Sequence, residues 1–146
     1  MSICLVSAFL DSGRDKWSSF NRSIDQYFNN FKPYLKMNHD MVVFMDDKHI
    51  EAFKLLCKDC NHITVIPINR EWMQKHIYAY SLLPKETEIM ASDYFKNLVK
   101  HRLHHPECCK PEYTMMTHSK IDFVVHVTNL VKYDYYAWTD FGFFSK

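Results

Sequence analysis

Short apolar segments that alternate with helical patterns are the feature that most constrains the fold of this sequence. Three such segments, Ile3–Phe9, 41–45 and 63–66, have the length and apolar character of buried strands. A polar loop or a helical pattern follows each of them, and no hairpin signal separates them. Parallel strands need long crossover connections, so the alternation predicts βαβ units and a mostly parallel sheet with helices on both faces.

The connections within the first half of the chain carry apolar residues at helical spacing. Residues 17–31 predict one amphipathic helix, which should end before Pro33 because the residue before a proline disfavours helical backbone. Asp47 is predicted to cap the helix that follows the second strand. Pro67 is predicted to close the third strand.

The second half of the chain is predicted to be mostly helical before it returns to the sheet. Residues 70–103 follow a helical pattern that is broken once, at Pro84. Residues 113–131 are apolar on most sides, which predicts one buried helix packed across the sheet. Residues 135–139 then form an apolar run that predicts a strand buried on both faces.

Oxygen-bearing side chains follow this last strand and form the first candidate site. Thr139 and Asp140 stand where the strand should end, and Gly142 allows the chain to turn into a loop. Open α/β sheets bind ligands at the carboxyl ends of their strands, so Asp140 can hold a hard cation and, through it, a phosphate. The alternative is that Asp140 caps whatever follows the strand.

Composition narrows the classes of protein and of ligand. The chain has 146 residues, of which 47% are hydrophobic and 16% aromatic, which indicates one globular domain with a real core. A formal net charge of +1 gives no electrostatic argument for nucleic acid. Two glycines exclude a Gly-rich phosphate loop, and no apolar run reaches the ~20 residues of a transmembrane helix.

Five cysteines lack the regular spacing of a disulfide framework, so we expect a reducing compartment, the cytoplasm. The segments 57–62 and 104–109 each contain cysteine and histidine at spacings that resemble half of a zinc site. The alternative interpretation is that these are reduced, partly buried thiols, since Cys57 falls on the apolar side of a predicted helix.

Two more candidate sites follow the first and second strands. The loop 11–15 contains Arg14, whose guanidinium can bind a phosphate in bidentate geometry, although the loop can equally be a solvated turn. Asp46 and Asp47 can bind a ribose or a cation, although one of them capping a helix explains half of that signal. In a parallel sheet, both loops and Asp140 would lie at the same edge.

Four segments taken together resemble the HtrL/YibB-like family. They are residues 6–14, residues 34–47, His118-Ser119-Lys120-Ile121-Asp122-Phe123, and Trp138-Thr139-Asp140-Phe141-Gly142. Members of that family occur with bacterial surface-polysaccharide genes and in some eukaryotes and viruses. The family is similar to glycosyltransferases of the GT-A fold, which implies a Rossmann-like α/β sheet and a nucleotide-sugar donor.

The resemblance also implies roles for individual residues. Asp140 would bind Mn²⁺ or Mg²⁺ against the diphosphate of the donor, although this chain has one aspartate where the fuller motif has two. No catalytic residue and no acceptor are implied. The expected contacts to the nucleotide sugar are Ser7, Arg14, Asp46, Asp47 and Lys120.

The end of the chain carries a separate expectation. In GT-A folds the acceptor site follows the metal motif, so residues 1–146 are expected to be the donor-binding half, with the acceptor half absent. Phe141, Phe143 and Phe144 must then be exposed, be covered by a partner, or fold back over the cleft with the tail. We expect the chain to self-associate through them and, alone, to lack transfer activity. The alternative function is a non-catalytic Rossmann-like module that binds a nucleotide or serves interactions.

Overall fold

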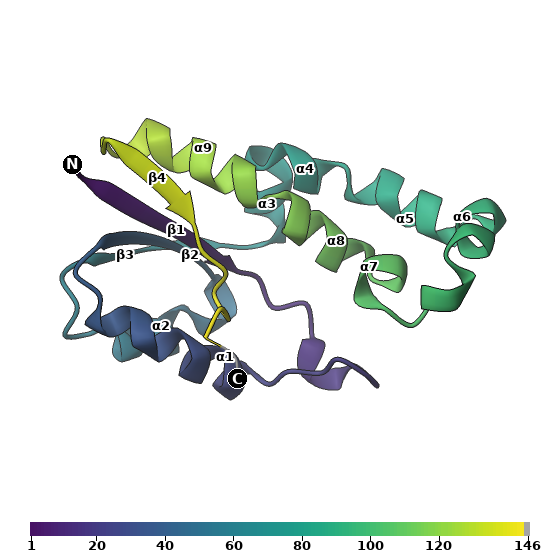
Figure 1. Ribbon diagram of the computed structural model, residues 1–146, viewed down its shortest axis with the longest axis horizontal. Helices are drawn as coiled ribbons and strands as arrows, with labels where there is room; N and C mark the ends of the chain where they lie inside the picture. The colour runs from purple at the N-terminus through teal and green to yellow at the C-terminus, as the bar shows by residue number, and fades with distance from the viewer. Residues whose placement is uncertain (145–146) are drawn as a thin grey trace.

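The computed structural model describes residues 1–144, and their strands form a four-stranded sheet (Figure 1). The strand order is β3-β2-β1-β4, and every neighbouring pair is parallel. The predicted α/β class with a mostly parallel sheet is confirmed, and the arrangement is consistent with a Rossmann-like fold. The strands are β1 (Ile3–Phe9), β2 (Asp40–Asp46), β3 (Ile63–Ile68) and β4 (Tyr135–Trp138).

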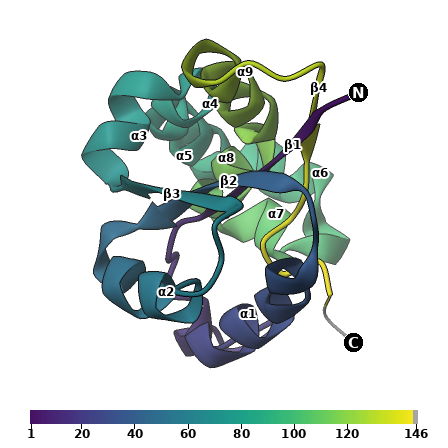
Figure 2. The same cartoon turned by 90° about the vertical axis from the view of Figure 1, so that its left-hand side faces the viewer.

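Helices cover both faces of the sheet and pack into two separate cores (Figure 2). Alternate residues of β2 divide between these cores, with Val42 and Phe44 in one and Met41, Val43 and Met45 in the other. The helices α1 (Ile24–Phe31) and α2 (Ile50–Leu56) cover one face. The other core includes residues of α3 (Arg70–His76), α4 (Tyr78–Ser81), α8 (Pro111–His118) and α9 (Lys120–Leu130).

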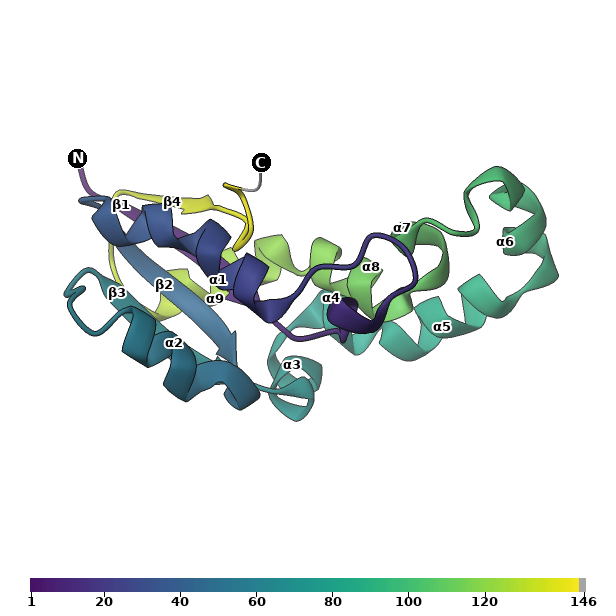
Figure 3. The ribbon, with the colours of Figure 1, turned by 90° about the horizontal axis from the view of Figure 1, so that it is seen from below.

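A helical arm extends away from the sheet (Figure 3). It consists of α5 (Leu83–Ala91), α6 (Asp93–Leu98), the 3₁₀ turn η4 (Lys100–Arg102) and α7 (Pro106–Cys109). Three further 3₁₀ turns are η1 (Arg14–Lys16), η2 (Lys32–Lys36) and η3 (Asp47–His49). Within residues 1–144, no helix has both the length and the apolar character that crossing a membrane requires.

The helix predicted over residues 17–31 is shorter than expected. It begins at Ile24 because Ser23 forms a capping box, in which Ser23 Oγ accepts from Gln26 N and Gln26 returns a bond to Ser23 N. Phe20 has a φ of 58°, which is incompatible with a right-handed helix. The helix ends at Phe31, before Pro33, as predicted.

The two long helical predictions are also wrong in their continuity. Residues 70–103 break at Ile77, Leu82, Ser92 and Val99, not once. The break at Leu82 lies just before the predicted one, and Pro84 itself sits in the first turn of α5, where its missing N–H costs nothing. Residues 113–131 break at Ser119, which separates α8 from α9. Pro67 does not close the third strand, because β3 is at the edge of the sheet and tolerates it.

The last strand differs most from its prediction. β4 pairs with β1 and lies at the edge of the sheet within the described residues, so it is not a central strand. Its residues alternate between exposed and half-buried, with Tyr135 55% exposed, and the strand is therefore not buried on both faces. Tyr136 and Trp138 pack against the core beneath α9, whereas Tyr135 and Ala137 face away from it.

The chain beyond β4 folds back over the sheet. Phe141 is 3% exposed and packs in the α1–α2 core, with its ring centroid 4.6 Å from that of Phe31 and 5.1 Å from that of Phe9. Of the alternatives for this tail, folding back is the one that applies to Phe141, which therefore adds nothing to an exposed aromatic surface. Phe143 is 65% exposed, and Phe144 is half-buried against Tyr34.

Candidate functional site

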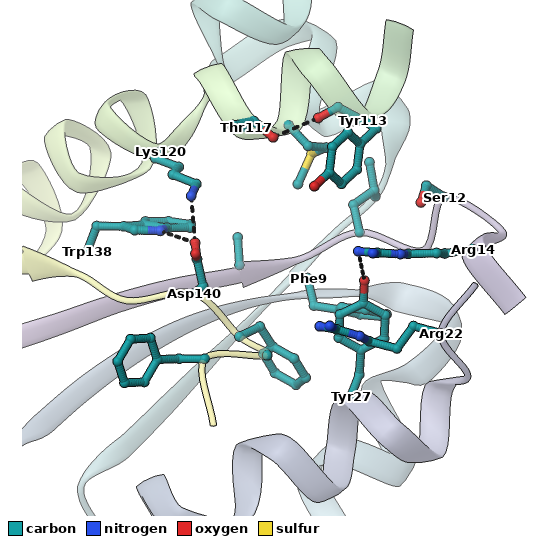
Figure 4. Close-up of a pocket in the computed structure, with 16 residues that line it drawn as sticks. Phe9, Ser12, Arg14, Arg22, Tyr27, Tyr113, Thr117, Lys120, Trp138 and Asp140 are labelled. Carbon is teal, nitrogen blue, oxygen red and sulfur yellow. Dashed lines mark hydrogen bonds and ion pairs between the residues drawn. The ribbon is translucent and has the colours of Figure 1, made fainter. Parts of the chain in front are cut away.

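The candidate site is a cleft between the carboxyl ends of β1 and β4, with a volume of about 390 Å³ (Figure 4). The chain moves outward from β1 through β2 to β3 and then returns to place β4 on the other side of β1. The crossover helices on the two sides of this point lie on opposite faces, which leaves a crevice between them. Such a switch point is where open α/β sheets bind ligands.

Arg14 is held in a fixed position at one end of the cleft. Gly13, with a φ of 69°, starts the turn η1 and directs Arg14 back across the loop. Arg14 Nε donates to the Phe20 carbonyl at 2.6 Å, and Nη1 donates to Tyr27 Oη at 3.0 Å. Trp17 and Tyr113 have ring centroids 5.5 Å and 5.6 Å from its Cζ. The guanidinium is therefore ordered before any ligand arrives.

Arg22 adds a second guanidinium, and Tyr27 contacts both. The Arg22 Cζ lies 5.1 Å from the ring centroid of Tyr27, whose hydroxyl accepts the bond from Arg14. Gly142 leaves room for Arg22, since a Cβ at that position would lie 2.8 Å from Arg22 Nη1. A side chain at position 142 would therefore displace the Arg22 guanidinium from its present position.

Lys120 and Asp140 form an ion pair at the β4 side of the cleft (Figure 4). Lys120 Nζ is 2.7 Å from Asp140 Oδ1, and Trp138 Nε1 donates to the same oxygen at 2.8 Å. Burial favours a raised pKa for Asp140, but the hydrogen bonds from Lys120 and Trp138 outweigh it and lower the pKa of this carboxyl. Asp140 is therefore an anion at neutral pH, and its charge is already balanced by an ammonium.

Tyr34 fixes the backbone that carries Asp140. Its hydroxyl donates to the Asp140 carbonyl at 3.2 Å and forms a second hydrogen bond with Thr139 Oγ1. Thr139 N also donates to the Val6 carbonyl, which continues the β1–β4 ladder by one residue. Thr139 is thus a positioning residue here, and its hydroxyl is occupied.

Asp46 and Asp47 lie outside the residues that line the cleft. Asp46 is 1% exposed and accepts from Asp11 N and Lys48 N, so it caps η3 and joins the loops after β1 and β2. The predicted cap at Asp47 is wrong, because Asp46 performs that role. Asp47 accepts a bond from Asn69 Nδ2 instead. The predicted meeting of the first two loops is correct, but here it is a structural contact.

Ser7 lies within β1 rather than at its end. The side chain is fully buried, and its Oγ has no hydrogen-bond partner among residues 1–144. It does not line the cleft. Of the residues that the family resemblance implies for the donor, Arg14 and Lys120 line the cleft together with Asp140.

The cysteine and histidine segments do not come together. Cys57 is buried in the α1–α2 core, where burial raises the pKa of its thiol to about 12. His104 and His105 lie against Phe20, with ring centroids 6.4 Å and 5.3 Å from that of Phe20, and none of these three residues lines the cleft. Among residues 1–144, no group of three or more His, Cys, Asp or Glu side chains is positioned to hold a metal.

Several residues that line the cleft were not predicted from the sequence to belong to a site. Arg22 falls on the polar side of the helix predicted over residues 17–31, and Tyr27 on its apolar stripe. Tyr113 and Thr117 belong to α8, within the segment predicted as one buried helix. Three cations and one carboxylate therefore line a partly aromatic cleft, and the sequence indicated only Arg14, Lys120 and Asp140.

The fold and the cleft together define an α/β protein with a parallel sheet and a cation-lined cleft at the switch point of that sheet. A family model described as "Bacterial protein of unknown function (HtrL_YibB)" matches residues 1–146. The chain belongs to this family. The comparisons with curated proteins and with solved structures found no significant match.

Proposed function

We propose that the cleft binds the diphosphate of a nucleotide sugar and that the protein is a glycosyltransferase-like protein. The observation that carries this proposal is the convergence of Arg14, Arg22 and Lys120 on one cleft at the switch point. Guanidinium groups bind phosphate oxygens in bidentate geometry, and an ordered guanidinium loses little entropy on binding. A diphosphate is the ligand that best matches three cations beside a single carboxylate.

The aromatic lining supports a nucleotide sugar rather than a free phosphate. Tyr27, Tyr113 and Trp138 line the cleft together with the cations. Their rings offer stacking surfaces for a base or for the apolar face of a sugar. In the proposed reaction the oxygen of an acceptor hydroxyl would form a bond to the anomeric carbon while the bond from that carbon to the diphosphate oxygen breaks. The hydroxyl proton would pass to water, and the nucleoside diphosphate would leave into the contacts of Arg14 and Arg22.

The proposal includes Mn²⁺ or Mg²⁺ only as an ion that arrives with the donor. Among residues 1–144, Asp140 is the one carboxylate that lines the cleft, and its Oδ1 already contacts Lys120 Nζ and Trp138 Nε1. The residues described do not form a metal site by themselves, so phosphate and water oxygens would have to complete the coordination. When bound, such a cation would stabilise the leaving diphosphate.

The same ion pair supports a second candidate function, a module that binds nucleotide without a metal and without catalysis. If Lys120 stays on Asp140, the two arginines alone provide the anion contacts. Binding of a nucleoside diphosphate that is equal with and without Mn²⁺, and no hydrolysis of a nucleotide sugar, would favour this candidate.

Calorimetry with pyrophosphate and with uridine, guanosine and adenosine diphosphates tests the proposal directly. Arg14→Gln should weaken binding roughly 10–100-fold, because a charge-assisted hydrogen bond contributes about 1.5–3 kcal/mol. Arg102→Gln is the matched control, since Arg102 is an exposed arginine of η4 outside the cleft. If no probe binds, or if both variants bind as the wild type does, the proposal is wrong.

A further inference from the structure

We propose that the tip of the helical arm, residues 93–110, docks the protein on an anionic membrane surface. This proposal is independent of the cleft and of its ligand. The tip combines exposed apolar side chains with cations that have no carboxylate partner, and it extends away from the sheet (Figure 3).

Two apolar side chains of the tip are among the most exposed in the molecule. Tyr94 is 79% exposed and Leu98 69%, and they lie one turn apart on the same side of α6. Leu103, just after η4, is 40% exposed. Large apolar residues that are exposed together commonly mark a surface that binds another protein or a membrane.

The charges of the tip are mostly positive. Lys96, Lys100, Arg102 and Lys110 are exposed, against two acidic residues in the same segment. Lys110, at the base of the segment, has its Nζ 5.3 Å from the ring centroid of Trp17, so the first three cations are the ones free to bind a surface. Among residues 1–144, none of these four cations forms an ion pair with a carboxylate. The chain as a whole has a formal net charge of only +1, so the excess of positive charge on the arm is not visible in the overall composition.

An anionic lipid surface satisfies both kinds of side chain at once. Leucine and tyrosine side chains can enter the boundary between headgroups and acyl chains, while lysine and arginine remain with the phosphates. Each cation near such a surface adds electrostatic attraction that salt weakens. A nucleic acid would use the cations but would leave Leu98 and Leu103 without an apolar partner.

The direction of the arm also agrees with this surface. The carboxyl ends of the strands, where the cleft lies, point toward the side from which the arm extends (Figure 1). A tip docked on a membrane would therefore place the cleft on the side of the molecule that faces the lipid.

Co-sedimentation of the full 146-residue chain with vesicles tests the proposal. The chain should sediment with phosphatidylcholine–phosphatidylglycerol vesicles (about 2:1) and not with phosphatidylcholine alone, and about 1 M salt should release it. Leu98→Asp should lower the partition coefficient at least about tenfold, because an apolar contact is replaced by a repelled charge.

Ile121→Asp is the matched control, since Ile121 is 70% exposed on α9, outside the arm. It should bind the mixed vesicles as the wild type does. Absence of binding, equal binding to neutral vesicles, or an equal loss in Leu98→Asp and Ile121→Asp would overturn the proposal. Binding to a DNA duplex that Leu98→Asp leaves unchanged, with no vesicle binding, would overturn it in favour of nucleic acid.

Discussion

Replacing Phe141 by alanine tests whether the segment after β4 belongs to the core. The Phe141 ring lies among four phenylalanine rings of β1, α1 and α2, with centroid distances from 4.6 to 6.2 Å. Its side chain is 3% exposed, so truncation removes nearly all of its apolar contacts and leaves a cavity. A buried phenylalanine truncated to alanine costs about 3–5 kcal/mol of unfolding free energy.

Urea denaturation followed by circular dichroism measures this cost. With a slope of roughly 2 kcal/mol per molar urea, the midpoint should fall by about 2 M. Phe143→Ala is the control, because Phe143 is two residues away but 65% exposed, and it should change the free energy by no more than about 0.5 kcal/mol. A loss below about 1 kcal/mol in Phe141→Ala, or equal losses in both variants, would refute the packing argument.

The other predictions concern single polar groups and thiols. The pKa of Asp140 is lowered in the folded protein, so its contribution to stability is present at neutral pH and lost as the pH falls below about 4. The half-exposed ion pair limits that contribution to less than ~1 kcal/mol, and the gap in melting temperature between wild type and Asp140→Asn should close on acidification. Ser7→Ala should keep or raise the melting temperature and leave diphosphate binding unchanged, because the buried Ser7 Oγ has no hydrogen-bond partner among residues 1–144. A clear fall in the melting temperature or in diphosphate affinity would contradict this. Cys109 is exposed and should react with a thiol reagent at about pH 8 well before Cys57, whose pKa is raised to about 12; mass mapping that finds Cys57 labelled first would reject this order.

The sheet could be predicted from the sequence because its strands are simple apolar segments. Ile3–Phe9 has the predicted bounds, and β2 extends the predicted strand by one residue at each end. The edge position of β4 could not be predicted, since an apolar run shows that a strand forms but not which strands flank it. For the same reason the sequence could not show that Asp46, which was predicted to contact a ligand, is instead buried in a contact between two loops.

The cleft was only partly predictable for a different reason. Arg14 and Asp140 follow strands that the sequence reveals, and Lys120 was implied by the family resemblance. Arg22, by contrast, enters the cleft through the geometry of an irregular loop. That geometry depends on Ser23, which delays the start of α1, and on the positive φ of Phe20. Apolar periodicity extended the helix through both residues because it carries no information on capping or on backbone handedness.

The division of the molecule into two cores has a consequence for how a ligand would act on its dynamics. The cleft is bounded by Arg22 and Tyr27 on the α1 side and by Lys120 on the α9 side, and the two cores have no residue in common. Local opening of either layer would release a ligand that contacts both. At a concentration of 100 Kd such a ligand adds about 2.7 kcal/mol to the free energy of each opening that releases it. Amide hydrogen exchange in α1 and in α9 should therefore slow by the same factor, although the two helices lie on opposite faces of the sheet.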